Sequence, residues 1–130
     1  MPYIDLPDQV PGIRSLFEFR PETAKPLLAL VETLLRGDNT LSRGDRELIA
    51  SYVSRLNSCQ FCEATHSAFA AVQLDEDWEL VEAAKRDPAT APVSSKLKSL
   101  LALAAKVAAG GSAVEEGYLA PADYADYTVS

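Results

Sequence analysis

The sequence predicts an all-α protein of five to seven helices, folded as a single domain over residues 1–130. Apolar residues recur at helical spacing in almost every segment, and no alternating strand pattern extends beyond a few residues. Glycine, proline and asparagine interrupt the apolar pattern where helices are expected to end. A chain of 130 residues, 48% of them hydrophobic, is long enough to bury a core.

The first part of the chain predicts two helices after an irregular start over residues 2–11. Residues 12–19 suit a short helix, and residues 21–35 suit a longer one, with Pro26 near its start. Its broad apolar face consists of Leu27, Leu28, Leu30, Val31, Leu34 and Leu35. Residues 37–39 contain Gly, Asp and Asn, which indicate its end.

The middle of the chain predicts two further helices in close succession. Ser42 and Asp45 resemble a capping box, with Asp in place of the usual Glu or Gln. The helix that follows carries Leu48, Ile49, Tyr52, Val53 and Leu56 at helical spacing. Asn57 and Ser58 interrupt this pattern, and the alanines of residues 58–73 favour another helix.

The last part of the chain predicts up to three helices. Asp75 is expected to cap the first, and residues 88–92 form a loop. Ser94 or Ser95 begins the second, which ends at two glycines, Gly110 and Gly111. A short final helix is expected over residues 121–127.

Charge and hydropathy exclude several classes of partner. The formal net charge of −7 argues against binding to nucleic acid or to an anionic membrane, because both require a basic surface. No signal peptide is expected, and the apolar stretch over residues 97–109 is too short to span a membrane. We therefore expect a cytoplasmic protein, where a structural disulfide is disfavoured and cysteines need another explanation.

Cys59 and Cys62 are the only cysteines, and they lie three residues apart. On a helix this spacing places two side chains on one face at about 5–6 Å, close enough for a disulfide. Cys59 is expected in the first turn of its helix, where the helix dipole favours a thiolate. The alternative is a pair of small buried side chains without redox chemistry.

His66 is the only histidine, and it lies four residues after Cys62. An imidazole one turn from a thiol can accept its proton and stabilise the thiolate. The alternative is an ordinary packed or surface histidine. Together with Cys59, the three side chains would share one helix face and form a redox site.

Glu47 has two interpretations. Spacing alone favours a surface carboxylate paired with Arg43, four residues earlier. In the functional alternative Glu47 accepts a hydrogen bond from His66 and orients it, which requires two helices to pack face to face.

A zinc site would use Cys59, Cys62 and His66 as ligands, with Glu47 as a possible fourth. A helix spreads the first three over about 10 Å, too far for one tetrahedral site. We expect no metal and no cofactor.

These residues carry a resemblance to a known family. The segment from Glu47 to Val53, the segment from Asn57 to Cys62, and His66 resemble the alkylhydroperoxidase D-like branch of the carboxymuconolactone decarboxylase superfamily. Its pattern is a Glu, eleven residues, Cys-x-x-Cys, three residues and a His, and every spacing fits. Residues 41–47 also look like the family, and residues 6–14 are similar to members called peroxidase-related proteins.

The resemblance implies a homo-oligomer (dimer, trimer or hexamer) that reduces alkyl hydroperoxides or hydrogen peroxide with electrons from a lipoyl-like or thioredoxin-like dithiol donor. Carried over by position, Cys62 is the peroxidatic thiol and Cys59 the resolving thiol. Glu47 and His66 form a proton relay. Characterised members carry a second His immediately before the second Cys, where this chain has Phe61.

Two rival functions are compatible with the same fold. One is a decarboxylase acting on a lactone acid, whose site would not need the thiol pair. The other is a non-enzymatic redox sensor or binding protein, which stays open because Phe61 replaces a relay histidine.

Overall fold

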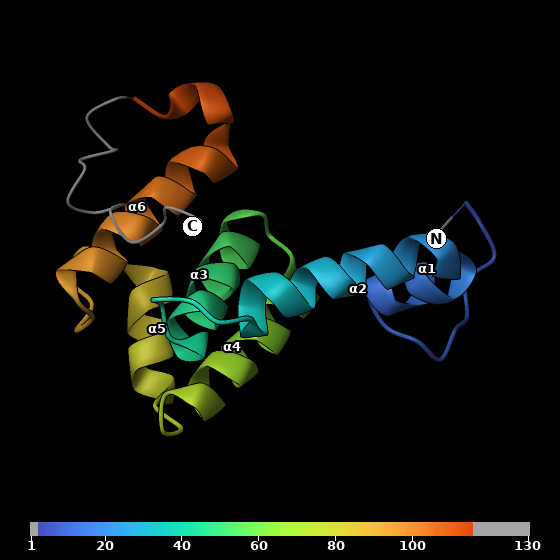
Figure 1. Cartoon of the computed structure of the whole chain (residues 1–130), viewed down its shortest axis with the longest axis horizontal. Coiled ribbons are helices and arrows are strands. Elements are labelled where there is room, and N and C mark those ends of the chain that lie inside the picture. The colour runs from blue at the N-terminus through green and yellow to red at the C-terminus, as the bar shows by residue number, and fades with distance from the viewer. Residues whose placement is uncertain (1–2, 116–130) are drawn as a thin grey trace. The chain divides into compact units, whose positions relative to one another are not determined.

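A computed structural model describes residues 3–115 of the chain. Within these residues it contains six α-helices, one short 3-10 helix and no strand, as predicted for an all-α fold (Figure 1). The elements are α1 (Ile13–Phe19), α2 (Pro21–Arg36), α3 (Arg43–Leu56), α4 (Gln60–Gln73), α5 (Trp78–Arg86), α6 (Ser95–Ala109) and η1 (Gly111–Ala113). The helix predicted over residues 121–127 lies outside the described residues.

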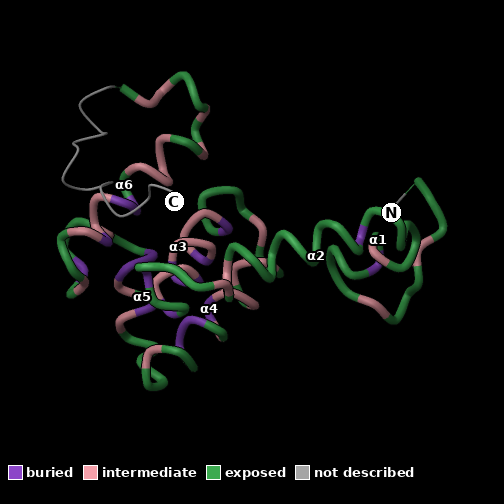
Figure 2. Tube along the Cα trace, in the orientation of Figure 1, coloured by how far each residue is buried: buried purple, intermediate pink, exposed green. Residues whose placement is uncertain are grey.

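The chain divides into two compact units, Met1–Asp38 and Asn39–Ser130. In the first, α1 packs against α2, and its buried residues in the described part of the chain are Ser15 and Ala24. Most of the apolar residues predicted along α2 are exposed, and the helix is coloured as exposed over most of its length (Figure 2). The single domain expected over residues 1–130 stays a prediction.

The second unit contains the hydrophobic core. α3 contacts α4, α5 and α6, and buried residues gather in these helices and in the loop before α6 (Figure 2). The core cluster consists of Leu48, Ala70, Ala71, Val81, Ala84, Ala91, Leu97 and Leu101. Alanine occupies four of these eight positions, and the small side chains of Ala70 and Ala71 on α4 and of Ala84 on α5 allow the helix backbones to approach closely.

Two of the predicted helix starts are confirmed by capping hydrogen bonds. The Ser42 hydroxyl accepts a hydrogen bond from the backbone N–H of Asp45 at 3.0 Å, which begins α3. The Ser94 hydroxyl accepts one from the N–H of Leu97 at 3.1 Å, which begins α6. Each bond satisfies one of the amides that a helix start leaves unpaired.

The predicted cap of α5 was wrong by two residues. Asp77, not Asp75, caps the helix, and its carboxylate accepts a hydrogen bond from the N–H of Leu80 at 2.8 Å. Asp75 and Glu76 both adopt positive φ, of 57° and 62°, in the turn after α4. Residues in this left-handed conformation cannot be part of a right-handed helix, so the cap of α5 lies two residues later than predicted.

Among residues 3–115, none of the helices is both long enough and apolar enough to cross a membrane.

Candidate active site

The turn between α3 and α4 places the two cysteines at the start of α4. Ser58 adopts a positive φ of 56°, and the N–H of Cys59 donates to the carbonyl of Ser54 at 2.9 Å. Cys59 is the N-cap of α4, and its Sγ accepts a hydrogen bond from the N–H of Cys62 at 3.4 Å. The start predicted at Ser58 is therefore two residues too early, because the left-handed residue delays the helix.

The position of each cysteine at the helix start differs from the expected one. Cys59 was expected in the first turn, but it is the capping residue, and Cys62 occupies the first turn. The unpaired N–H groups and the positive end of the helix dipole therefore lie closer to the Cys62 backbone than the sequence suggested. At the N-cap the Cys59 sulfur accepts a hydrogen bond from the N–H of Cys62, so the helix start still favours a thiolate at Cys59. The assignment of the attacking role to Cys62 rests on the family resemblance.

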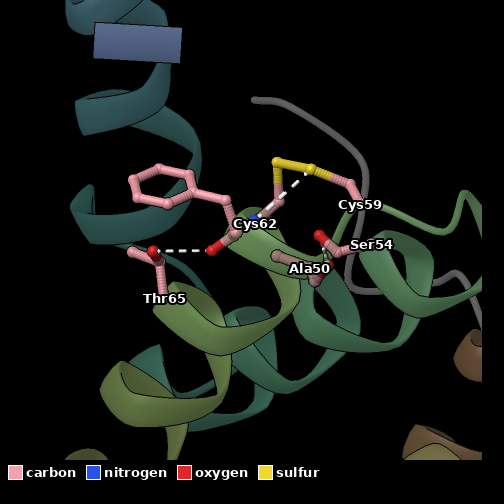
Figure 3. Close-up of a disulfide and its surroundings, with 6 residues drawn as sticks. Ala50, Ser54, Cys59, Cys62 and Thr65 are labelled. Atoms are coloured by element: carbon pink, nitrogen blue, oxygen red, sulfur yellow. Dashed lines mark hydrogen bonds between the residues drawn. A yellow bond between two sulfur atoms is a disulfide. The ribbon is translucent and has the colours of Figure 1, made fainter. Parts of the chain in front are cut away.

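Cys59 and Cys62 are joined by a disulfide, with their Cα atoms 5.4 Å apart (Figure 3). Figure 3 places the bond at the N-terminal end of α4, with Ser54 and Ala50 of α3 beside it. Both cysteines are half-buried. The spacing permits the bond, as predicted, and neither cysteine is fully buried.

Glu47 and His66 meet across the interface between α3 and α4. The Glu47 Oε2 and His66 Nδ1 atoms are 2.7 Å apart. The Glu47 side chain is 6% exposed and the His66 side chain 27% exposed. The surface ion pair with Arg43 that spacing favoured is therefore wrong, because α4 covers this face of α3.

The contact also fixes what the imidazole can do. A carboxylate at Nδ1 accepts the hydrogen of that nitrogen, and the lone pair of a neutral ring then lies on Nε2. His66 is one helical turn after Cys62 on α4, so the ring and the thiol share a face. The arrangement brings together a thiol pair, a potential base and a carboxylate that orients the base.

Sequence reasoning missed a polar network next to this pair. The Ser51 and Ser67 hydroxyl oxygens lie 2.7 Å apart at the buried interface of α3 and α4. The Lys85 ammonium group of α5 donates to Ser67 Oγ and to Glu63 Oε1, each at 3.0 Å. Glu82 is also paired with this ammonium group, at 2.6 Å.

Lys85 could have been identified from its position on α5. It lies four residues after Val81, which is fully buried. Residues at this spacing share a helix face, so a lysine there is expected to enter the core with partners. Its side chain is 4% exposed.

Hollows of different polarity lie beside the site helices. An apolar hollow of about 480 Å³ between α3 and α6 is lined by Ile49, Val53, Leu100, Leu103, Ala104, Val107 and Ala108. A more polar one of about 360 Å³ between α4 and α5 is lined by Gln60, Glu63, Ala64, Ser67, Trp78, Glu82 and Lys85. Across residues 3–115, the His, Cys, Asp and Glu side chains form no group of three that could hold a metal ion.

The model of the carboxymuconolactone decarboxylase family matches residues 21–89. This span contains all four candidate residues, Glu47, Cys59, Cys62 and His66. A comparison with curated protein sequences found no match.

One solved structure with a similar fold is the crystal structure of an alkylhydroperoxidase AhpD core, an uncharacterized peroxidase-related protein from Ralstonia eutropha JMP134. The TM-score is 0.76, and the sequences are 21% identical. The match covers 93% of this chain and 62% of that chain, so this chain spans less than two thirds of its length. At this identity the likeness establishes the fold.

Proposed function

The chain belongs to the carboxymuconolactone decarboxylase family, and from this premise we propose that it is a thiol-dependent peroxidase acting on alkyl hydroperoxides or hydrogen peroxide. The observation that carries the proposal is a half-buried Cys59–Cys62 disulfide at the start of α4, the helix that also carries His66, whose ring is held by Glu47 of α3. A disulfide between residues three apart, beside a base, is suited to a cycle of oxidation and reduction.

The first half of the cycle oxidises Cys62. His66 Nε2 accepts the thiol proton, and the Cys62 thiolate attacks the terminal oxygen of the peroxide. The O–O bond breaks, and an alcohol, or water in the case of hydrogen peroxide, leaves with the proton returned by His66. Cys62 is then a sulfenic acid.

The second half closes and reopens the disulfide. Cys59 attacks the Cys62 sulfur, the S–O bond breaks and water leaves, so that one peroxide has taken two electrons from the thiol pair. A dithiol donor of the lipoyl or thioredoxin type then reduces the disulfide by exchange and becomes oxidised. Such a donor fits the reducing cytoplasm, the compartment expected from the sequence.

Glu47 acts through His66. Its buried carboxylate holds the imidazole by Nδ1 and stabilises the imidazolium that forms when Cys62 loses its proton. The relay has no histidine immediately before Cys62, since Phe61 occupies that position. We therefore expect proton transfer to depend on His66.

The direct test follows peroxide consumption by the purified protein in the presence of dihydrolipoamide. We expect repeated turnover, with one dithiol oxidised for each peroxide consumed. A single equivalent of oxidation without turnover would favour the redox sensor instead. Release of carbon dioxide from carboxymuconolactone, without peroxide consumption, would favour the decarboxylase.

We also propose that the protein is a homo-oligomer. α2 exposes the apolar residues Leu27, Leu28, Leu30, Val31 and Leu34. An exposed apolar stripe of this length is typical of an interaction surface.

Light scattering after size exclusion is expected to give the mass of a dimer, trimer or hexamer. The variant Leu27→Glu/Leu34→Glu places two charges on the stripe and is expected to lower that mass. The control Lys25→Glu changes the net charge by the same amount on the opposite face of α2 and is expected to keep it. A monomeric wild type would contradict the proposal.

A further inference from the structure

The ammonium group of Lys85 is the centre of a charge cluster that the proposed cycle does not use. Its three contacts are with Glu63, Ser67 and Glu82, which accounts for the three hydrogens that it can donate. Arg55 of α3 approaches the same Glu63 carboxylate at 3.7 Å. The two cations balance the two carboxylates of the cluster.

Glu63 links this cluster to the dithiol. It directly follows Cys62 in the first turns of α4, and its N–H donates to the carbonyl of Cys59 at 2.9 Å. It also precedes His66 by three residues, so it is a neighbour of that side chain on the helix surface. Among the described residues, it is the carboxylate nearest in sequence to the two sulfurs.

Burial makes Lys85 the stronger of the two cations that neutralise Glu63. The Lys85 side chain is 4% exposed and the Glu63 side chain 25% exposed, whereas Arg55 is 44% exposed and more distant. Ion pairs that are shielded from water are screened less by salt and solvent. Loss of Lys85 would therefore leave Glu63 with a negative charge that Arg55 compensates only in part.

We propose that Lys85 is a positioning residue which sets the reduction potential of the Cys59–Cys62 pair by holding and neutralising Glu63. The disulfide is uncharged, whereas the reduced pair contains thiolate. An uncompensated carboxylate on the residue that follows Cys62 disfavours the thiolate and with it the reduced form. Lys85 therefore makes the disulfide easier to reduce and Cys62 more reactive. The inference adds regulation to the proposed function and requires only that the thiol pair is redox-active.

The charged side chains of this cluster and of the Glu47–His66 pair come from three helices. α3 contributes Glu47 and Arg55, α4 contributes Glu63 and His66, and α5 contributes Lys85 and Glu82. Two substitutions break the same Lys85–Glu63 ion pair but change the net charge in opposite directions. Lys85→Met removes a positive charge, and Glu63→Gln removes a negative one.

The experiment measures two properties of the full-length protein. The first is the thiol–disulfide equilibrium in dithiothreitol redox buffers, and the second is the rate at which iodoacetamide alkylates the reduced protein. In Lys85→Met we expect the equilibrium constant for reduction to fall threefold to tenfold, which corresponds to about 15–30 mV, with slower alkylation. In Glu63→Gln we expect a shift of similar size in the opposite direction.

Two further variants complete the design. Lys85→Met/Glu63→Gln restores the charge balance, and its potential is expected to return close to the wild-type value. Lys98→Met removes an equal charge from α6, which carries none of the site residues, and is expected to leave both measurements unchanged.

A merely structural role predicts a different outcome, because both single variants lose the same ion pair. Shifts in the same direction, or none in either variant, would overturn the proposal. If Lys85→Met does not fold, the sign of the shift in Glu63→Gln still decides. The measurement involves no peroxide, so a protein without peroxidase turnover would refute the proposed function and leave this test intact.

Discussion

Cys62→Ser is expected to abolish catalytic peroxide consumption, with a fall in turnover of about 10³-fold or more. A serine hydroxyl is not ionised at neutral pH, and it cannot form a sulfenic acid or a disulfide. Cys62 lies in the first turn of α4, where its N–H donates to Cys59 Sγ. The substitution replaces one atom on a half-buried side chain, so the fold is expected to persist, and circular dichroism checks this.

Cys59→Ser provides the matched comparison. Cys62 can still be oxidised once in this variant, and the sulfenic acid then persists because the resolving thiol is absent. We expect one equivalent of peroxide to be consumed rapidly and the product to be trapped by dimedone on Cys62. Dimedone labelling of Cys59 in the Cys62→Ser variant, with rapid consumption, would reverse the roles of the two cysteines. Undiminished turnover in both variants would refute the thiol mechanism.

The sequence was sufficient to predict the α-helices of residues 3–115 and a spacing that allows the Cys59–Cys62 bond, because both depend on local spacing. Leu48, Ile49, Tyr52 and Val53 recur at the period of an α-helix. The distance between Cys59 and Cys62 is determined by the short stretch of backbone that joins them. Errors arose at turns. Ser58, Asp75 and Glu76 adopt left-handed conformations that the local sequence pattern did not indicate. The turn with Ser58 and the turn with Asp75 and Glu76 each move the following helix start or its cap by two residues.

Contacts between helices could not be predicted from the spacing of residues along one helix. The proximity of Glu47 to His66 depends on how α3 packs on α4, which is decided by buried residues such as Leu48, Ala70 and Ala71. Spacing on one helix therefore favoured Arg43 as the partner of Glu47. Only the family resemblance indicated that Glu47 faces α4 and contacts His66. The family pattern links these two positions because the two helices pack against each other in its members.

His66→Ala is expected to lower peroxide turnover by about 10²-fold, the usual contribution of a positioned general base. It is also expected to destabilise the fold, because it leaves the Glu47 carboxylate buried without its partner. The cost of such a group is about 1–3 kcal/mol in the free energy of unfolding. Urea unfolding of the oxidised protein measures this cost without interference from thiol exchange.

The double variant Glu47→Gln/His66→Ala separates the two effects. It removes the buried charge, so we expect part of the stability lost in His66→Ala to return, while turnover remains as low as in that variant. Glu47→Gln alone keeps an amide oxygen that accepts from Nδ1 but loses the charge that stabilises the imidazolium. Its stability is therefore expected to stay near the wild-type value, with turnover reduced about tenfold.

Arg43→Ala is the control for this set, because Arg43 is the surface partner that spacing assigned to Glu47. Removal of the exposed Arg43 charge is expected to alter the free energy of unfolding by no more than about 0.5 kcal/mol. If Arg43→Ala lowered turnover as much as His66→Ala, the relay would not run through the Glu47–His66 contact. If the losses of stability in Glu47→Gln and His66→Ala simply added in the double variant, the two side chains would not be energetically coupled.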